Sequence, residues 1–176
     1  VNEEAIYGSR PFETVYQNQD MITNRIDEQI NFNWVRNSPS KGVSEDNFSI
    51  FWKSNITPTQ TDTYTIYLEA DEEAGLEIKD DEGKTILHLA SQKEEVKHKV
   101  KLKKDHNYTF ELSYQEKTHE AVVKLSWECS QFEKQPIKSQ WNGEVSWENT
   151  YVCFTKNKAT QMGGFLLFIL TNIVFC

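Results

Sequence analysis

DTYTIYLEADEEAGLEI, at residues 62–78, alternates apolar and polar side chains in its first half. Tyr64, Ile66 and Leu68 fall on one side of the chain, with threonine and tyrosine side chains between them. Successive side chains of a β-strand point to opposite faces of the sheet. This period of two therefore predicts a strand with one buried face.

The same period recurs on both sides of that stretch. DNFSIFWK, at 46–53, places Phe48, Ile50 and Trp52 on one face. EEVKHKVKLKK, at 94–104, alternates a face that we expect to be buried with a row of lysines, and the expected buried residues are Val96, His98, Val100 and Leu102. We interpret the lysines as the solvated side of a strand, where like charges discourage pairing at a sheet edge.

Two further alternating segments, NYTFELSY at 107–114 and HEAVVKLSWE at 119–128, are separated by a short polar stretch. That arrangement predicts a hairpin. Several short strands with an alternating core pattern indicate an all-β fold, an antiparallel β-sandwich or barrel.

Length and charge restrict the function. A chain of 176 residues is one main domain's worth, and its net charge of -8 repels the phosphates of nucleic acids, so we expect no nucleic-acid partner. The apolar segment FLLFILTNIVFC, at 165–176, is shorter than the roughly 20 residues of a spanning helix, and we expect no membrane span. Cys129, Cys153 and Cys176 show no C-x-x-C spacing, which indicates neither a zinc site nor a disulfide framework.

Taken in order, these segments resemble the carbohydrate-associated domain family named after the fourteen-kilodalton fragment of anthrax protective antigen. The resemblance covers about 120 residues and implies a β-sandwich of the protective-antigen type. Its pieces are ITNRIDEQINFNW (22–34), DNFSIFW (46–52), DTYTIYLEADEEAGLEI (62–78), VKLKKDHNYTFELSY (100–114) and AVVKLSW (121–127).

The resemblance also implies a site. Family members that bind sugar hold a calcium ion with two consecutive aspartates in the loop after the T-Y-T strand, and this position reads Asp71-Glu72 here. Asp71 and Glu72 are therefore the candidate metal ligands and candidate sugar-binding residues, although the longer Glu72 side chain alters a geometry built for two aspartates. The alternative is an exposed acidic turn. No cofactor is required, and calcium is the candidate ion.

Asn33 and Trp34 are the other candidate ligand-binding residues. An aromatic face and a planar amide suit a pyranose ring. The alternative is that this segment packs into the core.

A second resemblance lies in the flanks. NEEAIYGSRPF, at 2–12, is similar to a segment late in the catalytic barrel of glycoside hydrolase family 29 α-L-fucosidases, and TYVCFTKNK, at 150–158, resembles the strand that follows it there. The resulting prediction is a barrel remnant at 1–16, the sandwich at 17–140, a return segment at 141–160 and a truncated or frameshifted apolar tail at 161–176.

The leading hypothesis is an accessory, carbohydrate-associated domain inserted in an α-L-fucosidase-like glycoside hydrolase. A retaining glycosidase needs two carboxyl groups about 5–5.5 Å apart, whereas neighbouring acids on a strand, such as Glu94 and Glu95, point to opposite faces. We assign no catalytic residue to this chain and expect the catalytic host domain to lie outside it.

Two alternatives remain open: an extracellular, calcium-assisted glycan-binding module of the lectin or adhesin type, and a purely structural insert. The resemblance implies a glycan or glycoconjugate partner. It also implies an extracellular, periplasmic or cell-surface location.

Overall fold

The computed structural model describes residues 6–8, 12–17, 22–39, 45–46, 48–118 and 120–138, and for the strands before Asp27 it describes the backbone alone. All of these residues belong to the first of two compact units, 1–141 and 142–176. Their regular structure consists of antiparallel strands, which confirms the predicted all-β class. Within the described ranges no helix is long and apolar enough to cross a membrane.

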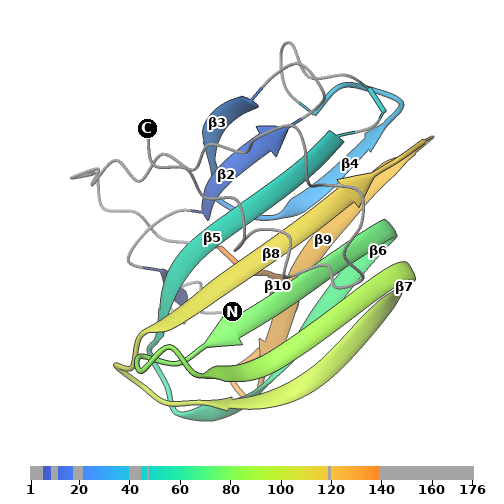
Figure 1. The fold of residues 1–176 in the computed structure, drawn as a ribbon. Helices are drawn as coiled ribbons and strands as arrows, with labels where there is room; N and C mark the ends of the chain where they lie inside the picture. The colour runs from blue at the N-terminus through green and yellow to red at the C-terminus, as the bar shows by residue number, and fades with distance from the viewer. Residues whose placement is uncertain are drawn as a thin grey trace. The chain divides into compact units, whose positions relative to one another are not determined.

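The ten strands appear in chain order in Figure 1. They are β1 (Ile6–Gly8), β2 (Phe12–Gln17), β3 (Ile22–Asp27), β4 (Asn31–Val35), β5 (Phe48–Pro58), β6 (Asp62–Lys79), β7 (Thr85–Leu102), β8 (Tyr108–Glu116), β9 (Ala121–Cys129) and β10 (Phe132–Pro136).

One curled sheet forms the sandwich, because two long strands run through both of its halves. The strand order is β10-β9-β6-β8-β5-β2-β3, with β7 paired to β6, β4 to β9 and β1 to β5. β6 pairs with β9 over its first half and with β8 over its second half. Side chains of the two halves meet in the core, where the ring of Phe110 in β8 lies 6.4 Å from that of Trp127 in β9.

The core is rich in aromatic side chains that alternate along the strands. Trp52, Trp127, Tyr64, Tyr114 and Phe48 are among the largest fully buried side chains. The buried indole nitrogen Nε1 of Trp52 donates a hydrogen bond to Oδ2 of Asp27 at 2.9 Å. This bond satisfies a polar group that would otherwise destabilise the interior.

The predicted hairpin of 107–114 and 119–128 is wrong. These segments form β8 and β9, but β6 lies between them in the strand order (Figure 1). Each of them pairs with a different half of β6. The chain therefore crosses from one half of the sandwich to the other between β8 and β9.

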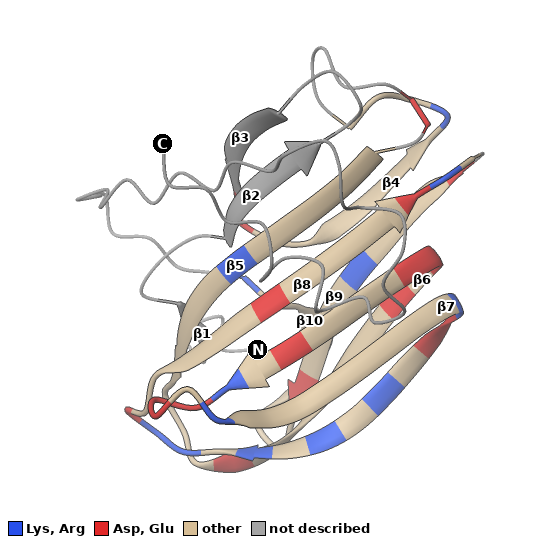
Figure 2. Ribbon diagram, in the orientation of Figure 1, with Lys and Arg blue, Asp and Glu red and all other residues tan. Residues whose placement is uncertain are grey.

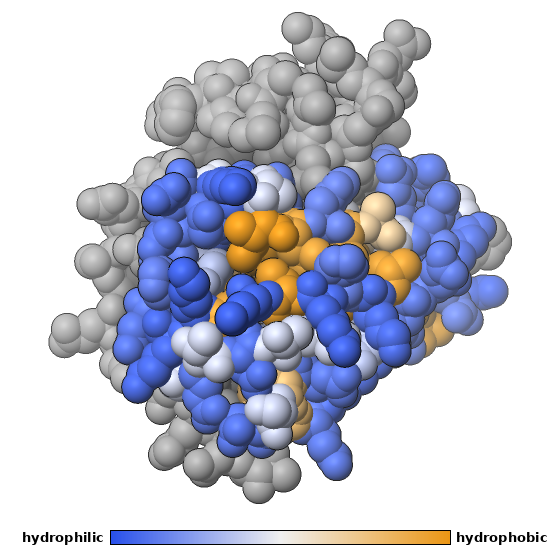
Figure 3. Space-filling model, turned by 90° about the horizontal axis from the view of Figure 1, so that it is seen from below, coloured by the Kyte–Doolittle hydropathy of each residue, from blue (hydrophilic) through white to orange (hydrophobic). Residues whose placement is uncertain are grey.

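β7 is an edge strand that pairs with β6 alone among the described strands. The lysines Lys97, Lys99 and Lys101 are exposed, and Figure 2 shows this positive charge along the strand. His98, which we expected on the buried face, is also exposed. Seen from below, hydrophilic side chains surround a central apolar area of the surface (Figure 3).

The N-terminal flank contributes backbone to the same sheet. β1 and β2 both pair with β5. Apart from residue 17, they lie within the range 1–16 that the fucosidase resemblance assigns to a barrel remnant. The predicted return segment at 141–160 and the tail at 161–176 lie outside the described residues, as do Cys153 and Cys176. Cys129 is a free, half-buried thiol, and burial raises its pKa.

Candidate functional site

Asp71 and Glu72 lie at a β-bulge inside β6, where the resemblance places a loop. The pairing register of β6 with β7 shifts between Ala70 and Glu73, and at the same point β6 changes its other partner from β9 to β8. Bulges bend a strand and redirect its side chains. Both side chains are half-buried, so the alternative of a fully exposed acidic turn does not describe them.

The side chain of Asp71 is held by two donors from neighbouring strands. Its Oδ1 accepts a hydrogen bond of 2.8 Å from the hydroxyl of Tyr114 in β8 and another of 2.8 Å from the backbone N–H of Val122 in β9. The bulge of β6 is thereby tied to both strands between which it changes partner.

A third acidic residue, Glu116, lies against the same tyrosine. The Tyr114 hydroxyl is hydrogen-bonded to Oε2 of Glu116, whose side chain is buried with 1% exposure. Oε1 of Glu116 is buried and has no hydrogen-bond partner among the described residues. The pKa of Glu116 is raised to about 7, mainly by burial and also by the negative charges of Asp71, Glu72 and Asp46, while the Tyr114 bond lowers it.

Trp34 and Asn33 lie in β4 at a second irregularity. The pairing register of β4 with β9 shifts between Asn33 and Val35, and Val35 has a positive φ of 55° with 47% exposure. A β-branched residue rarely adopts this left-handed conformation, which marks a locally strained turn of the backbone. Asn33 is exposed, and its Oδ1 accepts a hydrogen bond of 3.2 Å from the N–H of Val35.

Trp34 is half-buried in an aromatic cluster. Its ring stacks on Phe32 with centroids 4.7 Å apart, meets Phe48 edge-on at 6.1 Å and lies 6.5 Å from Tyr114. Most of the Trp34 ring therefore packs against the core, as the alternative interpretation of this segment expected. A partly exposed part remains.

The structure brings the candidate residues of β4 and β6 to one end of the sandwich. Tyr114 contacts the Trp34 ring on one side and Asp71 on the other. Asn33 pairs in register with Val122, whose N–H donates to Asp71. Two strand bulges far apart in the sequence thus share Tyr114 and Val122 as common neighbours.

Tyr114 and Glu116 are the residues that the sequence analysis missed as parts of this site. The alternation of NYTFELSY, at 107–114, places Tyr114 on the apolar face of its strand together with Tyr108, Phe110 and Leu112. Continuing the same period of two would have placed Glu116 on that inward face, and a glutamate on a core face is the signal that could have identified it.

The donor set does not fit a calcium ion as it stands. Calcium takes six to eight oxygen ligands, whereas Oδ1 of Asp71 already accepts two hydrogen bonds. In the described part of the chain no group of three or more His, Cys, Asp or Glu side chains is arranged to hold a metal. Calcium binding by Asp71 and Glu72 stays a prediction of the resemblance.

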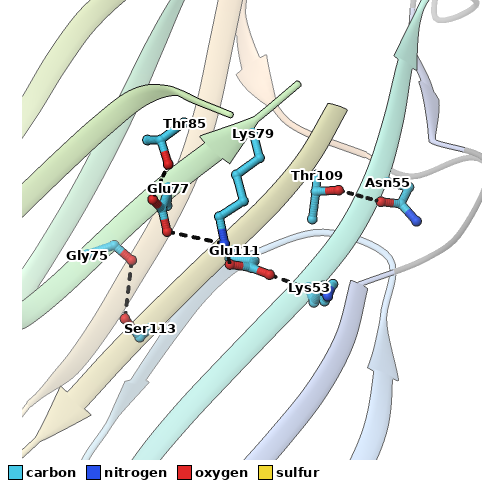
Figure 4. Close-up of polar contacts among 9 residues, drawn as sticks. All are labelled: Lys53, Asn55, Gly75, Glu77, Lys79, Thr85, Thr109, Glu111 and Ser113. Atoms are coloured by element: carbon cyan, nitrogen blue, oxygen red, sulfur yellow. Dashed lines mark hydrogen bonds and ion pairs between the residues drawn. The ribbon is translucent and has the colours of Figure 1, made fainter. Parts of the chain in front are cut away.

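The outer face of the β5-β8-β6 half carries a different set of acidic residues, paired with lysines (Figure 4). Glu111 contacts Lys79 at 2.7 Å and Lys53 at 3.3 Å, and Glu77 contacts Lys79 at 3.4 Å. Carboxylates neutralised in this way hold the surface together and show no pair free for acid and base catalysis.

The fold and the family model together define the class of this protein. It is a PA14 domain: residues 5–141 match the model of that family, and the chain belongs to it. The match begins at residue 5, inside the range assigned to the fucosidase flank, so the fucosidase-like flanks stay a prediction without support from the family match.

Among curated proteins, the anti-sigma-I factor RsgI3 of Acetivibrio thermocellus is 25% identical over 117 residues, 65% of this chain and 18% of that protein. The chain thus spans less than a fifth of that relative. An anti-sigma factor domain-containing protein of known structure has a TM-score of 0.64 and 22% identity, over 80% of this chain and 52% of that one. The Epithelial Adhesin 9 A domain of Candida glabrata has a TM-score of 0.57 and 11% identity, over 78% and 90%. The structural likenesses show a shared fold.

Proposed function

We propose that this chain is a glycan-binding module of a larger extracellular or cell-surface protein. It binds sugar at the end of the sandwich where the bulges of β4 and β6 meet. The observation that carries the proposal is that Trp34 and Asp71 both contact Tyr114, while Asn33 pairs with Val122, whose N–H donates to Asp71.

The chemistry of this end suits a sugar. Asn33 is exposed, and its side-chain oxygen accepts a hydrogen bond from the N–H of Val35. The nitrogen of the same amide can therefore donate to a ligand. Trp34 adds a partly exposed aromatic ring, and aromatic rings with a few polar groups are the usual lining of a saccharide site.

The likeness to carbohydrate-binding proteins supports the same function. The Candida glabrata adhesin domain was solved in complex with Galb1-4GlcNAc, and a PA14 sugar-binding domain from an RTX adhesin has a TM-score of 0.50 over 74% of this chain. These ligands belong to those proteins. For this chain they support a glycan as the class of ligand and leave the sugar to be identified.

The host protein is a separate matter. The match to an anti-sigma factor supports a module that senses a ligand outside the cell for a regulatory protein. The fucosidase-like flanks support instead an accessory domain inserted in a glycoside hydrolase. Reading the genomic DNA on both sides of the coding segment distinguishes them, because one host carries a barrel with catalytic carboxylates upstream and the other does not.

The binding proposal is tested on a glycan array followed by calorimetry with the strongest hit. Replacing the amide in Asn33→Ala should weaken binding at least tenfold, about 1.4 kcal/mol. Asn31→Ala is the matched control, since Asn31 is exposed in the same strand two positions away from the bulge. Equal effects of the two variants, or no binding to any glycan at millimolar concentration, would show that this end is not a sugar site.

A further inference from the structure

Two carboxyl groups lie against a single hydroxyl at the candidate site. Tyr114 Oη is within hydrogen-bond distance of Asp71 Oδ1, at 2.8 Å, and of Glu116 Oε2. A tyrosine hydroxyl has one hydrogen to donate. If both carboxyl groups were ionised, one of them would face the lone pairs of the tyrosine oxygen with no hydrogen between.

The second hydrogen must therefore belong to one of the carboxyl groups, and the surroundings decide which. Asp71 is half-buried, and its Oδ1 already accepts a second hydrogen bond, from the backbone N–H of Val122. Glu116 is 1% exposed, and one of its oxygens has no partner in the described part of the chain. A neutral acid leaves a carbonyl oxygen unpaired there, which costs much less than an unpaired buried charge.

We infer that Glu116 carries a proton and donates it to Tyr114, which donates in turn to Asp71. This hydrogen-bond chain fastens the β6 bulge to β8 and β9 without a metal ion, and it weakens when Glu116 ionises. We call Glu116, Tyr114, Asp71 and the N–H of Val122 the proton clasp. It does not depend on the glycan proposal, because no ligand takes part in it.

The charged groups around Glu116 agree with this assignment. Within the described ranges, those that act on it are acidic, namely Asp71 and Glu72 from β6 and Asp46 before β5. Tyr114 on its own strand contributes a hydroxyl whose pKa burial also raises, so the tyrosine remains a donor. The pKa of about 7 for Glu116 places its ionisation in the physiological range.

The clasp gives stability a defined pH dependence. A glutamate carboxyl ordinarily has a pKa of 4.5, and in the fold the pKa of Glu116 is raised to about 7. Between these values the folded state holds a proton that the unfolded state lacks, so stability falls as pH rises. The contribution is fully present below pH 4.5 and is lost once pH passes about 7.

The test compares Glu116→Gln with the wild type from pH 5 to pH 8. Glutamine cannot ionise, and its side-chain amide can still donate to Tyr114. The wild-type folding constant should fall by up to about a hundredfold relative to that of Glu116→Gln across this range. Glu120→Gln is the matched control, because Glu120 is exposed in the connection after β8, and it should follow the wild type. Parallel curves for the wild type and Glu116→Gln would overturn the clasp.

Two measurements on the wild type keep the test decisive if the variant does not fold. The side-chain carboxyl carbon of Glu116, followed by NMR, should titrate with a midpoint near 7, and a midpoint below about 5 would overturn the proposal. Calcium chloride at 2 mM, roughly the affinity limit of extracellular calcium modules, should leave Tm unchanged at pH 6. A calcium-dependent rise in Tm that Asp71→Asn abolishes would show a metal site in place of the clasp.

Discussion

Glu111 and Glu116 lie five residues apart on β8, yet their surroundings are opposite in sign. An odd separation on a strand places them on opposite faces. Glu111 faces outward between Lys53 and Lys79, whereas Glu116 faces inward toward Asp71, Glu72 and Asp46. Glu111 is held by ion pairs, whereas Glu116 is held by the hydrogen bond that its proton makes to Tyr114.

The difference shows how the two faces of the strand are stabilised. Paired charges on the outer face add modest stability. A buried carboxyl among like charges makes the inward face respond to pH. The inward glutamate is also the one that lies beside the candidate binding residues, through Tyr114.

Among these changes, removing the Tyr114 ring should lower the free energy of unfolding most. Tyr114 has no exposed surface and contacts both Trp34 and Phe48, so Tyr114→Ala opens a cavity and removes the hydroxyl of the clasp. We expect a loss of roughly 3–5 kcal/mol in the free energy of unfolding, measured by urea denaturation. A loss below about 1 kcal/mol would mean that the aromatic cluster does not support this end.

Removing only the hydroxyl should have a smaller effect that isolates the clasp. Tyr114→Phe keeps the ring but leaves Asp71 with one donor and the protonated Glu116 without its acceptor, for an expected loss of about 1–3 kcal/mol at pH 6. Tyr64→Phe is the control, because the Tyr64 hydroxyl donates to one backbone carbonyl, that of Gln60, at 3.1 Å. If both variants lose the same free energy and keep the same pH dependence, the Tyr114 hydroxyl has no special role.

Much of the strand assignment could be predicted from the alternation of side chains. The period of two correctly assigned strands to the segments around Phe48, Tyr64, Tyr108 and Val123, and all four of these residues are buried. The resemblance added Asp71 and Glu72 as candidate site residues, and the chemistry of an aromatic ring and an amide added Trp34 and Asn33. A pattern along one strand fixes which side chains share a face.

The same pattern does not fix which strands become neighbours. β8 and β9 are consecutive and read as a hairpin, but β6 inserts between them, and that insertion brings Asp71 to Tyr114 and Val122. The bulge of β6 could not be predicted either, because an extra residue in a strand depends on its two partners. His98 was misplaced for a related reason: β7 is an edge strand, and its alternate face is only partly covered.

The smallest expected effects lie on the outer face, where the two lysines beside Glu111 can be removed separately (Figure 4). Lys79→Met leaves both Glu77 and Glu111 without their closest cation, and because the Lys79 side chain is 22% exposed we expect a loss of about 1 kcal/mol. Lys53→Met removes the longer 3.3 Å contact of a side chain that is 48% exposed, and should cost at most about 0.5 kcal/mol. Screening weakens exposed pairs, so 0.5 M NaCl should reduce the Lys53→Met effect toward zero. The effect of Tyr114→Phe should persist in the same salt, because its hydrogen bonds are buried. If 0.5 M NaCl also reduced the free-energy loss of Tyr114→Phe, the inward and outward faces of β8 would be held by the same kind of interaction.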